Sequence, residues 1–423
     1  MRIDPLDLFT IKGAVTLPKK HQFAGREDLL SKSLDEIVID GSVHVIFGER
    51  GSGKTSLGWQ LLGPLSGDRT LLKERSIRPK LLREKQFHCI WCTCNSWIKS
   101  ISDLVSAIVL DPEPEFTLRS SFPELFEPSF MTRIQQKYGV GWWFDAPASP
   151  KQKPVPPPPP PPGPRSGTNE DLGAFLALEE MLARAQKNNK KTGFVFFLDE
   201  FDRLEKRAEI GDLLKALNNV RFVILGVGAS RSALVAQHAS VGRKISSCEV
   251  PLFTPDEVNS FFDNVEKRSD MSVRFTRDFR STVAGVSSGF PWLVQQLGFY
   301  SLLRVMGNDG IDSAGTSIKL GVDVLEQMLP TFLRDKLGGD PGNLPKIDSV
   351  EGLLLRALSS KRAGRMSRDD LVNTLPSEMR GFYERAVRAL EDLGLVYKQQ
   401  QEVRIKDPLT KVLVELSIEN RIL

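Results

Sequence analysis

The sequence predicts an α/β fold in which helices cover both faces of a parallel sheet. A continuous apolar run rich in β-formers, 194–198, and a second mostly apolar segment, 220–227, are typical of strands buried in a parallel sheet. A third apolar segment, 43–47, precedes a glycine-rich loop and a helical stretch at 56–62. Strands that alternate with helices in this way favour a parallel sheet, and the chain from about Thr254 onward reads as mostly helical.

Length and composition exclude several classes of protein. The 423 residues allow two to four domains, because a domain usually has roughly 100–200 residues. Hydrophobic residues at 40% and charged residues at 26% exclude wholesale disorder and a collagen-like fibre. The 57 basic and 53 acidic residues give a net charge of +4, which is too small to predict nucleic-acid binding from bulk charge.

The sequence predicts no association with a membrane. Its longest apolar stretches fall short of the ~18–20 residues that span a bilayer. The first residues contain an acid and no continuous apolar segment, which argues against a secretory signal. Four cysteines in a chain of this length do not predict a disulfide framework. We therefore expect a cytoplasmic location.

A proline run divides the first half of the chain. Seven prolines at 156–162 cannot join a helix or sheet, since proline lacks an amide donor, so we expect a surface spacer in the polyproline II conformation. The alternative is a ligand for a proline-recognising module. After the run, Thr168 with Asp171 predicts the start of a helix that continues to about Gln186, and a second helix is expected over 204–217.

The glycine-rich loop is a complete G-x-x-x-x-G-K-[ST] motif, residues 48–55. Its glycines allow backbone amides to form an anion nest at a helix N-terminus. Lys54 would reach the β- and γ-phosphates, and the Thr55 hydroxyl would hold Mg²⁺. A chance glycine-rich turn is the alternative, which the flanking strand and helix disfavour. The residues of this motif predicted to bind ATP are Gly48, Gly51, Ser52, Gly53, Lys54, Thr55 and Ser56.

A second acidic element follows the strand at 194–198. Asp199 would support Mg²⁺, and Glu200, one residue further, is the candidate general base for the attacking water. An acidic pair after a strand is by itself equally consistent with a solvated loop or a helix cap. The phosphate-binding loop elsewhere in the chain favours the catalytic interpretation.

These motifs together resemble the AAA+ ATPases of the origin-recognition and archaeal type and the related STAND signalling ATPases. The stretches 48–55 and 198–204 carry the resemblance, and residues 23–27 resemble the entry motif on the adenine side. The resemblance implies that Ser230, after the strand at 220–227, is the polar sensor 1. It also implies that Arg243 is an arginine finger that completes a neighbouring subunit's site, although an ordinary surface arginine is as consistent with the sequence.

Residues 289–293 resemble the G-x-P element with which STAND proteins close a helical lid over the nucleotide, which implies a nucleotide contact by Pro291. The origin-recognition pattern has an arginine after the glycine, and this sequence has Pro291 and Trp292 there. The departure favours the STAND side. The resemblance does not cover about 73–167, and the distance from Thr55 to Asp199 exceeds the ~30 residues of a simple βαβ unit, so we expect an insertion.

The C-terminal residues predict a winged helix. Helices are expected at 350–358, 367–375 and 378–393, followed by two strands of a wing at 395–397 and 402–405. The third helix carries three arginines against four acidic residues, which is a poor match to a phosphate backbone. This favours a regulatory or protein-contacting role over DNA binding. A basic loop with Lys361, Arg362, Arg365 and Arg368 is the best local patch for DNA.

Two further clusters have structural explanations. On a strand, Cys89 would face opposite to Cys92 and Cys94, and no second metal half-site lies nearby, so a buried core strand is favoured over zinc. The aromatic residues between 116 and 144 are expected to form the core of the insertion rather than a partner surface.

The predicted architecture is a P-loop NTPase core at 1–253 with an insertion at about 73–167, a helical lid at 254–345 and a winged-helix domain at 346–423. The predicted function is an ATP-binding, ATP-hydrolysing switch with ATP and Mg²⁺ as cofactors. It would act through nucleotide-dependent homo-oligomers or a partner effector protein, as in a bacterial defence system. The alternative is a DNA-handling AAA+ ATPase of the initiator or transposition-regulator type.

Overall fold

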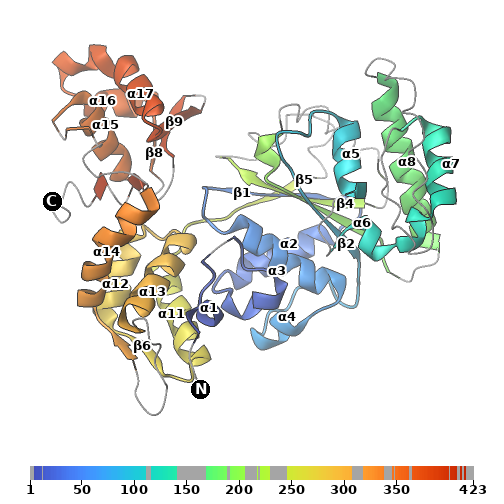
Figure 1. The fold of residues 1–423 in the computed structure, drawn as a ribbon, viewed down its shortest axis with the longest axis horizontal. Helices are drawn as coiled ribbons and strands as arrows, with labels where there is room; N and C mark the ends of the chain where they lie inside the picture. The colour runs from blue at the N-terminus through green and yellow to red at the C-terminus, as the bar shows by residue number, and fades with distance from the viewer. Residues whose placement is uncertain are drawn as a thin grey trace, which may run out of the picture. The chain divides into compact units, whose positions relative to one another are not determined.

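The computed structural model of the chain describes most of its residues in two compact units (Figure 1). The first unit comprises residues 1–25, 49–53 and 251–423, and the second comprises 26–48 and 54–250. The described residues are 4–11, 13–110, 116–140, 168–187, 191–204, 217, 220–228, 245–306, 318–337, 345–346, 348–361, 364–399, 401–406, 410–411 and 414–415. The proline run and the helix expected over 204–217 fall almost entirely outside these residues.

The second unit contains a five-stranded parallel sheet with the strand order β2-β3-β4-β1-β5. The strands are β1 (Val43–Gly48), β2 (His88–Thr93), β3 (Phe194–Asp199), β4 (Val220–Val227) and β5 (Ile245–Glu249). The helices and 3₁₀ turns are α2 (Glu27–Ile37), α3 (Lys54–Ser66), α4 (Thr70–Glu74), α5 (Ile101–Leu110), α6 (Leu118–Ser121), η2 (Pro123–Phe126), α7 (Pro128–Tyr138), α8 (Thr168–Lys187) and η3 (Phe201–Arg203). The predicted α/β class with a parallel sheet is confirmed.

Both faces of the sheet are covered, which explains why its strands are almost continuously apolar. On one face, α3 packs so closely that a Cβ on Gly58 would lie 2.7 Å from Leu225 Cδ2. Trp59 of α3 stacks on Trp91 of β2 with ring centroids 4.3 Å apart. The close packing fixes the helix that begins at the phosphate-binding loop.

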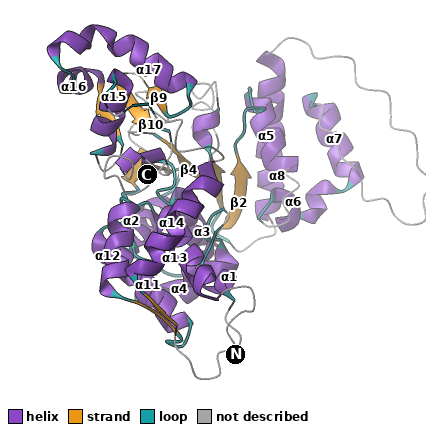
Figure 2. Ribbon diagram, turned by 60° about the vertical axis from the view of Figure 1, so that its left-hand side comes forward, coloured by secondary structure: helices purple, strands orange, loops and turns teal. Residues whose placement is uncertain are grey.

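The opposite face carries the main core cluster, which the strands form with α5 and α8. Figure 2 shows β2 beside α5 and α8. Phe122 and Phe130 are buried in this cluster, which confirms the core interpretation for these two aromatic residues. The segment expected to be an insertion therefore supplies both an edge strand of the sheet, β2, and helices that cover it.

The cysteines at 89 and 92 in β2 and at 94 just after it are buried, as a core strand predicts. Cys92 and Cys94 belong to the cluster with α5, whereas the Cys89 thiol points to the Leu62 carbonyl of α3 on the other face. Burial raises the pKa of the Cys89 thiol to about 12. A neutral, enclosed thiol of this kind is a packing group.

The first unit contains the helical lid, an N-terminal segment and the C-terminal module. Its elements are α1 (Pro5–Leu8), η1 (Leu17–Gln22), α11 (Pro255–Arg268), β6 (Val273–Phe275), α12 (Arg277–Val286), α13 (Pro291–Met306), β7 (Ile318–Leu320), α14 (Val322–Leu337), α15 (Val350–Ser359), β8 (Arg365–Ser367), α16 (Arg368–Thr374), η5 (Ser377–Phe382), α17 (Tyr383–Asp392), β9 (Val396–Gln399) and β10 (Glu402–Ile405). Phe9 packs against Phe261 and Phe299 of the lid, with centroids 6.1 and 6.4 Å away. Residues 1–25 therefore group with the lid rather than with the sheet.

The C-terminal module has the predicted winged-helix arrangement. Helices α15, α16 and α17 enclose a core of leucines and valines. The predicted wing strands β9 and β10 pair in antiparallel fashion, and β10 also pairs with a short strand, β8, that the sequence pattern did not indicate. Ser367 caps α16 by accepting a hydrogen bond from the Asp370 amide.

One predicted helix of this module is wrong in extent. The segment expected as one helix over 378–393 consists of the 3₁₀ turn η5 and the separate helix α17. Gly381 has low helix propensity, and Phe382 adopts φ −93° and ψ 0°, which interrupts the helix. Arg380 therefore lies on the turn, where its Nε donates to the Leu375 carbonyl, and α17 itself carries two arginines against three acidic residues.

Within the described ranges, no helix combines the length and the apolar character needed to cross a bilayer.

A buried histidine in β1 makes stability depend on pH. The His44 ring bonds Ser246 Oγ at 2.7 Å and Ser33 Oγ at 3.0 Å, and burial lowers the pKa of His44 from 6.5 to about 4. Between about pH 6.5 and pH 4, His44 is therefore protonated in the unfolded chain and neutral in the folded chain. We expect the free energy of unfolding to fall by roughly 2 kcal/mol between pH 7.5 and pH 5 through this group alone.

Chemical denaturation of the wild type and of His44→Gln at both pH values checks this expectation. Glutamine retains hydrogen-bonding capacity and does not titrate, so the variant should lack this part of the pH dependence. Equal losses of unfolding free energy in the two proteins would assign the pH dependence to other groups.

Candidate nucleotide site

The phosphate-binding loop joins β1 to α3, the strand and helix that the motif requires. Gly51 and Gly53 have φ values of +77° and +92°, which a side chain would strain. The Ser52 amide donates to the Glu49 carbonyl at 3.1 Å and closes the turn. The Ser52 hydroxyl is buried and has no hydrogen-bond partner among the described residues. A phosphate oxygen would satisfy this group, so the loop fits an anionic ligand.

Lys54 is the first residue of α3 and is only 8% exposed. Its ammonium donates to the Gly48 carbonyl at 3.2 Å, so the side chain folds back along the loop. A buried cation beside a helix N-terminus provides the field that a polyphosphate needs. Ser56 follows in the first turn of α3 and is half-buried.

Thr55 and Asp199 meet although they lie 144 positions apart in the sequence. The Thr55 hydroxyl donates to Asp199 Oδ1 at 3.2 Å, because β3 and α3 end and begin at the same edge of the sheet. Burial raises the pKa of Asp199 to about 6, although the hydrogen bonds from Thr55 and from the Glu200 amide act in the opposite direction. A hydroxyl beside a carboxylate is the hard-oxygen donor set that Mg²⁺ prefers, so these two residues fit the predicted metal.

Glu200 adopts an unusual backbone conformation. Its φ of +54° is left-handed, which costs a non-glycine residue about 1–2 kcal/mol. Its amide donates to Asp199 Oδ1 at 2.9 Å. Backbone strain held at such a position points to a functional constraint.

The Glu200 carboxylate is held by a neighbouring arginine. Arg203 donates through Nε to Oε2 at 3.0 Å and through a terminal nitrogen to Oε1 at 3.2 Å. This two-point ion pair fixes the orientation of the carboxylate. Arg203 would have to release Glu200 before that residue could accept a proton from water.

Asp202 makes a structural contact that the sequence did not predict. Its Oδ1 accepts a hydrogen bond from the Val227 amide at 2.7 Å, which ties the turn after β3 to the end of β4. The signal was present in the sequence as an acid three positions after Asp199. Its partner, the Val227 amide, lies at the end of β4, and only the fold shows that β4 is adjacent to β3.

The remaining predicted site residues fall in different places. Pro291 is buried at the start of α13 in the first unit, after Gly289, whose carbonyl accepts from the Phe253 amide at 2.7 Å. Ser230 and Arg243 lie outside the described residues. The structure thus brings together Lys54, Thr55, Asp199 and Glu200.

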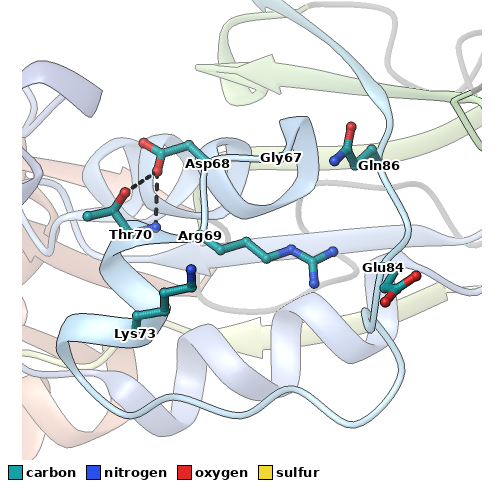
Figure 3. Close-up of a pocket in the computed structure, with 7 residues that line it drawn as sticks. All are labelled: Gly67, Asp68, Arg69, Thr70, Lys73, Glu84 and Gln86. Carbon is teal, nitrogen blue, oxygen red and sulfur yellow. Dashed lines mark hydrogen bonds between the residues drawn. The ribbon is translucent and has the colours of Figure 1, made fainter.

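A separate open cavity of about 590 Å³ follows α3 (Figure 3). It is lined by Gly67, Asp68, Arg69, Thr70, Lys73, Glu84 and Gln86. Asp68 accepts hydrogen bonds from the Thr70 amide and hydroxyl at 3.0 and 2.6 Å. The two cations of the lining are matched by two carboxylates, so the cavity lacks the positive field of an anion site.

Comparison with known proteins gives matches at the level of structure only. No protein-family model matches the chain, and no curated protein matches its sequence. A Walker-type ATPase of Pyrococcus abyssi is 14% identical, with a TM-score of 0.44 over 96% of this chain and 99% of that one. The ORC1 protein of Aeropyrum pernix, solved in complex with DNA, is 13% identical, with a TM-score of 0.44 over 99% and 98% of the chains. RuvB of Thermotoga maritima is 14% identical, with a TM-score of 0.39 over 96% and 98%. Similarity of this degree carries no information on what this chain binds.

Proposed function

We propose that the chain binds ATP with Mg²⁺ at the phosphate-binding loop and hydrolyses it. The observation that carries the proposal is the hydrogen bond between Thr55 and Asp199, which places a hydroxyl and a buried carboxylate together beside Lys54. Ser52, with its buried hydroxyl, and the glycines of the loop would hold the phosphates. When bound, Mg²⁺ would neutralise charge that develops on the transferred phosphoryl group.

Glu200 would act as the general base, because its carboxylate follows the metal-site residue directly and lies at the same edge of the sheet. The ion pair between Arg203 and Glu200 represents the resting state of the site. This ion pair would have to break before Glu200 abstracts a proton from water. Ser230 and Arg243 remain proposed as sensor and arginine finger, and Pro291 as the lid residue that responds to the nucleotide.

We further propose that the nucleotide operates a switch of the AAA+/STAND type that acts through self-assembly or a partner protein. The winged helix supports this choice over DNA handling. Arg368 of the predicted basic loop pairs with Glu384 at 3.0 Å, and Arg365 pairs with Glu49 at 3.3 Å. Arginines already matched by carboxylates offer little attraction to a phosphate backbone.

Light scattering with ATP, with ADP and with duplex DNA tests the switch. We expect the molar mass to rise at least twofold with ATP and Mg²⁺ in the Glu200→Gln variant, which should hold the triphosphate state. A partner-dependent switch predicts the same rise only when the partner is added. Salt-sensitive binding of duplex DNA, together with a molar mass that does not change when ATP is added without DNA, would instead support the DNA-handling alternative.

A further inference from the structure

The wing of the C-terminal module is built around a carboxylate that belongs to the phosphate-binding loop. Arg404 of β10 and Arg365 of β8 are directly opposite each other in the antiparallel pair. Like charges at such a position destabilise a sheet unless an anion lies between them. Glu49 supplies the anion: its Oε1 lies 3.4 Å from Arg404 and 3.3 Å from Arg365.

Because this cluster is buried, water has little access to solvate Arg404 in place of the Glu49 carboxylate. The Arg404 side chain is 1% exposed and Glu49 is 17% exposed. Glu402, on the same strand, contacts the other terminal nitrogen of Arg404 at 2.6 Å. A guanidinium this deeply buried requires matched carboxylates, because an uncompensated buried charge costs several kcal/mol.

A second contact ties the C-terminal residues to the lid. Lys411 is 4% exposed, and its ammonium donates to the hydroxyl of Ser288 and to Glu415. Ser288 is the residue before Gly289, in the turn that leads into α13. The C-terminal module therefore contacts Glu49 and Ser288, and these residues belong to the same compact unit as the module.

We propose that Glu49, Arg365 and Arg404 form a latch by which the winged helix controls nucleotide exchange. Glu49 immediately follows Gly48, so its backbone belongs to the turn that would wrap the phosphates. While Arg365 and Arg404 are paired with Glu49, the loop cannot open to release its ligand. Opening of the loop requires that these ion pairs with the wing break. The conformations of the loop and the wing are thereby coupled: a ligand or partner that moves the wing changes nucleotide release, and nucleotide in the loop changes the stability of the wing contact. The exchange step of this proposal rests on the proposed binding of nucleotide.

The first experiment measures dissociation of a fluorescent ADP analogue by displacement with excess ADP. We expect release to be roughly tenfold faster in Glu49→Gln and in Arg365→Ala than in the wild type, because each variant removes an ion pair of the latch. Arg368→Ala is the matched control: it removes an exposed arginine of the same module and should release the analogue at the wild-type rate. Equal rates in all four proteins would overturn the latch, whereas absence of binding in the wild type would overturn the proposed nucleotide site.

The second experiment needs no nucleotide. Hydrogen exchange at the amides of 402–405 should be faster in Glu49→Gln than in the wild type, since the wing loses the anion between its arginines. In Glu49→Lys the exchange should be faster still, and the double variant Glu49→Lys with Arg365→Glu should return toward the wild-type rate. Rescue by the exchanged charges distinguishes the latch from a general loss of folding. Unchanged protection in Glu49→Gln, or failure of the double variant to recover, would contradict the proposal.

Discussion

The Lys54→Ala variant is expected to lose ATP binding by at least about a hundredfold. The ammonium is the buried cation of the phosphate-binding loop, and each charged hydrogen bond to a phosphate contributes about 1.5–3 kcal/mol. Two such bonds, to the β- and γ-phosphates, correspond to a change in Kd of roughly two to four orders of magnitude. Titration calorimetry with ATP and Mg²⁺ measures the loss.

Lys73→Ala is the matched control for that experiment. It removes the same charge from the lining of the separate cavity, so ATP should bind it as the wild type does. A loss of affinity in Lys73→Ala with retention in Lys54→Ala would place the ligand in that cavity (Figure 3) and would refute the proposed site. Thermal unfolding of both variants verifies that each is folded.

The Glu200→Gln variant is expected to bind ATP normally and to hydrolyse it about 10²–10⁴ times more slowly. The amide preserves the size of the side chain but cannot accept the proton of the attacking water. A steady-state phosphate-release assay, together with a binding titration, separates the two effects. The expected pattern is a fall in kcat with an unchanged Kd for ATP.

Glu84→Gln serves as the control, because its carboxylate lies in the cavity lining away from the predicted metal residues. Its turnover should equal that of the wild type. If Glu200→Gln also turned over at that rate, Glu200 would have no role as the base, and its left-handed backbone would need another explanation. Loss of ATP binding in Glu200→Gln would show that the carboxylate acts on the ground state instead.

The secondary structure around the candidate site could be predicted closely from the chain. The strands at 43–47, 194–198 and 220–227 are confirmed as β1, β3 and β4, because fully buried strands carry continuous apolar runs. The predicted extent of the third helix of the winged-helix module was wrong, since Gly381 has low helix propensity and the backbone at Phe382 interrupts the helix. The three-domain division of the chain remains a prediction.

The conformation and ion pairing of Glu200 could not be predicted. The acidic pair after a strand indicates a role for Asp199 and Glu200, but not that Glu200 is left-handed and held by Arg203. That state depends on the geometry of the turn after β3, where Asp202 binds the Val227 amide. Neighbouring strands that are distant in sequence determine such a contact.

The sequence by itself determined the candidate groups of this protein: a phosphate-binding loop with its lysine, a distant acidic pair and a C-terminal module whose third helix lacks a surplus of positive charge. These features are local, because glycine conformations, strand hydrophobicity and residue charge are properties of short segments. The tertiary structure alone decided which of them meet. It brought Thr55 into contact with Asp199 and put Glu49 between Arg365 and Arg404, so that Arg365, which the sequence offers as part of a basic patch for DNA, is neutralised by the loop. Ion pairs between residues hundreds of positions apart leave no pattern in a single sequence, because they depend only on how the packed elements bring charges together.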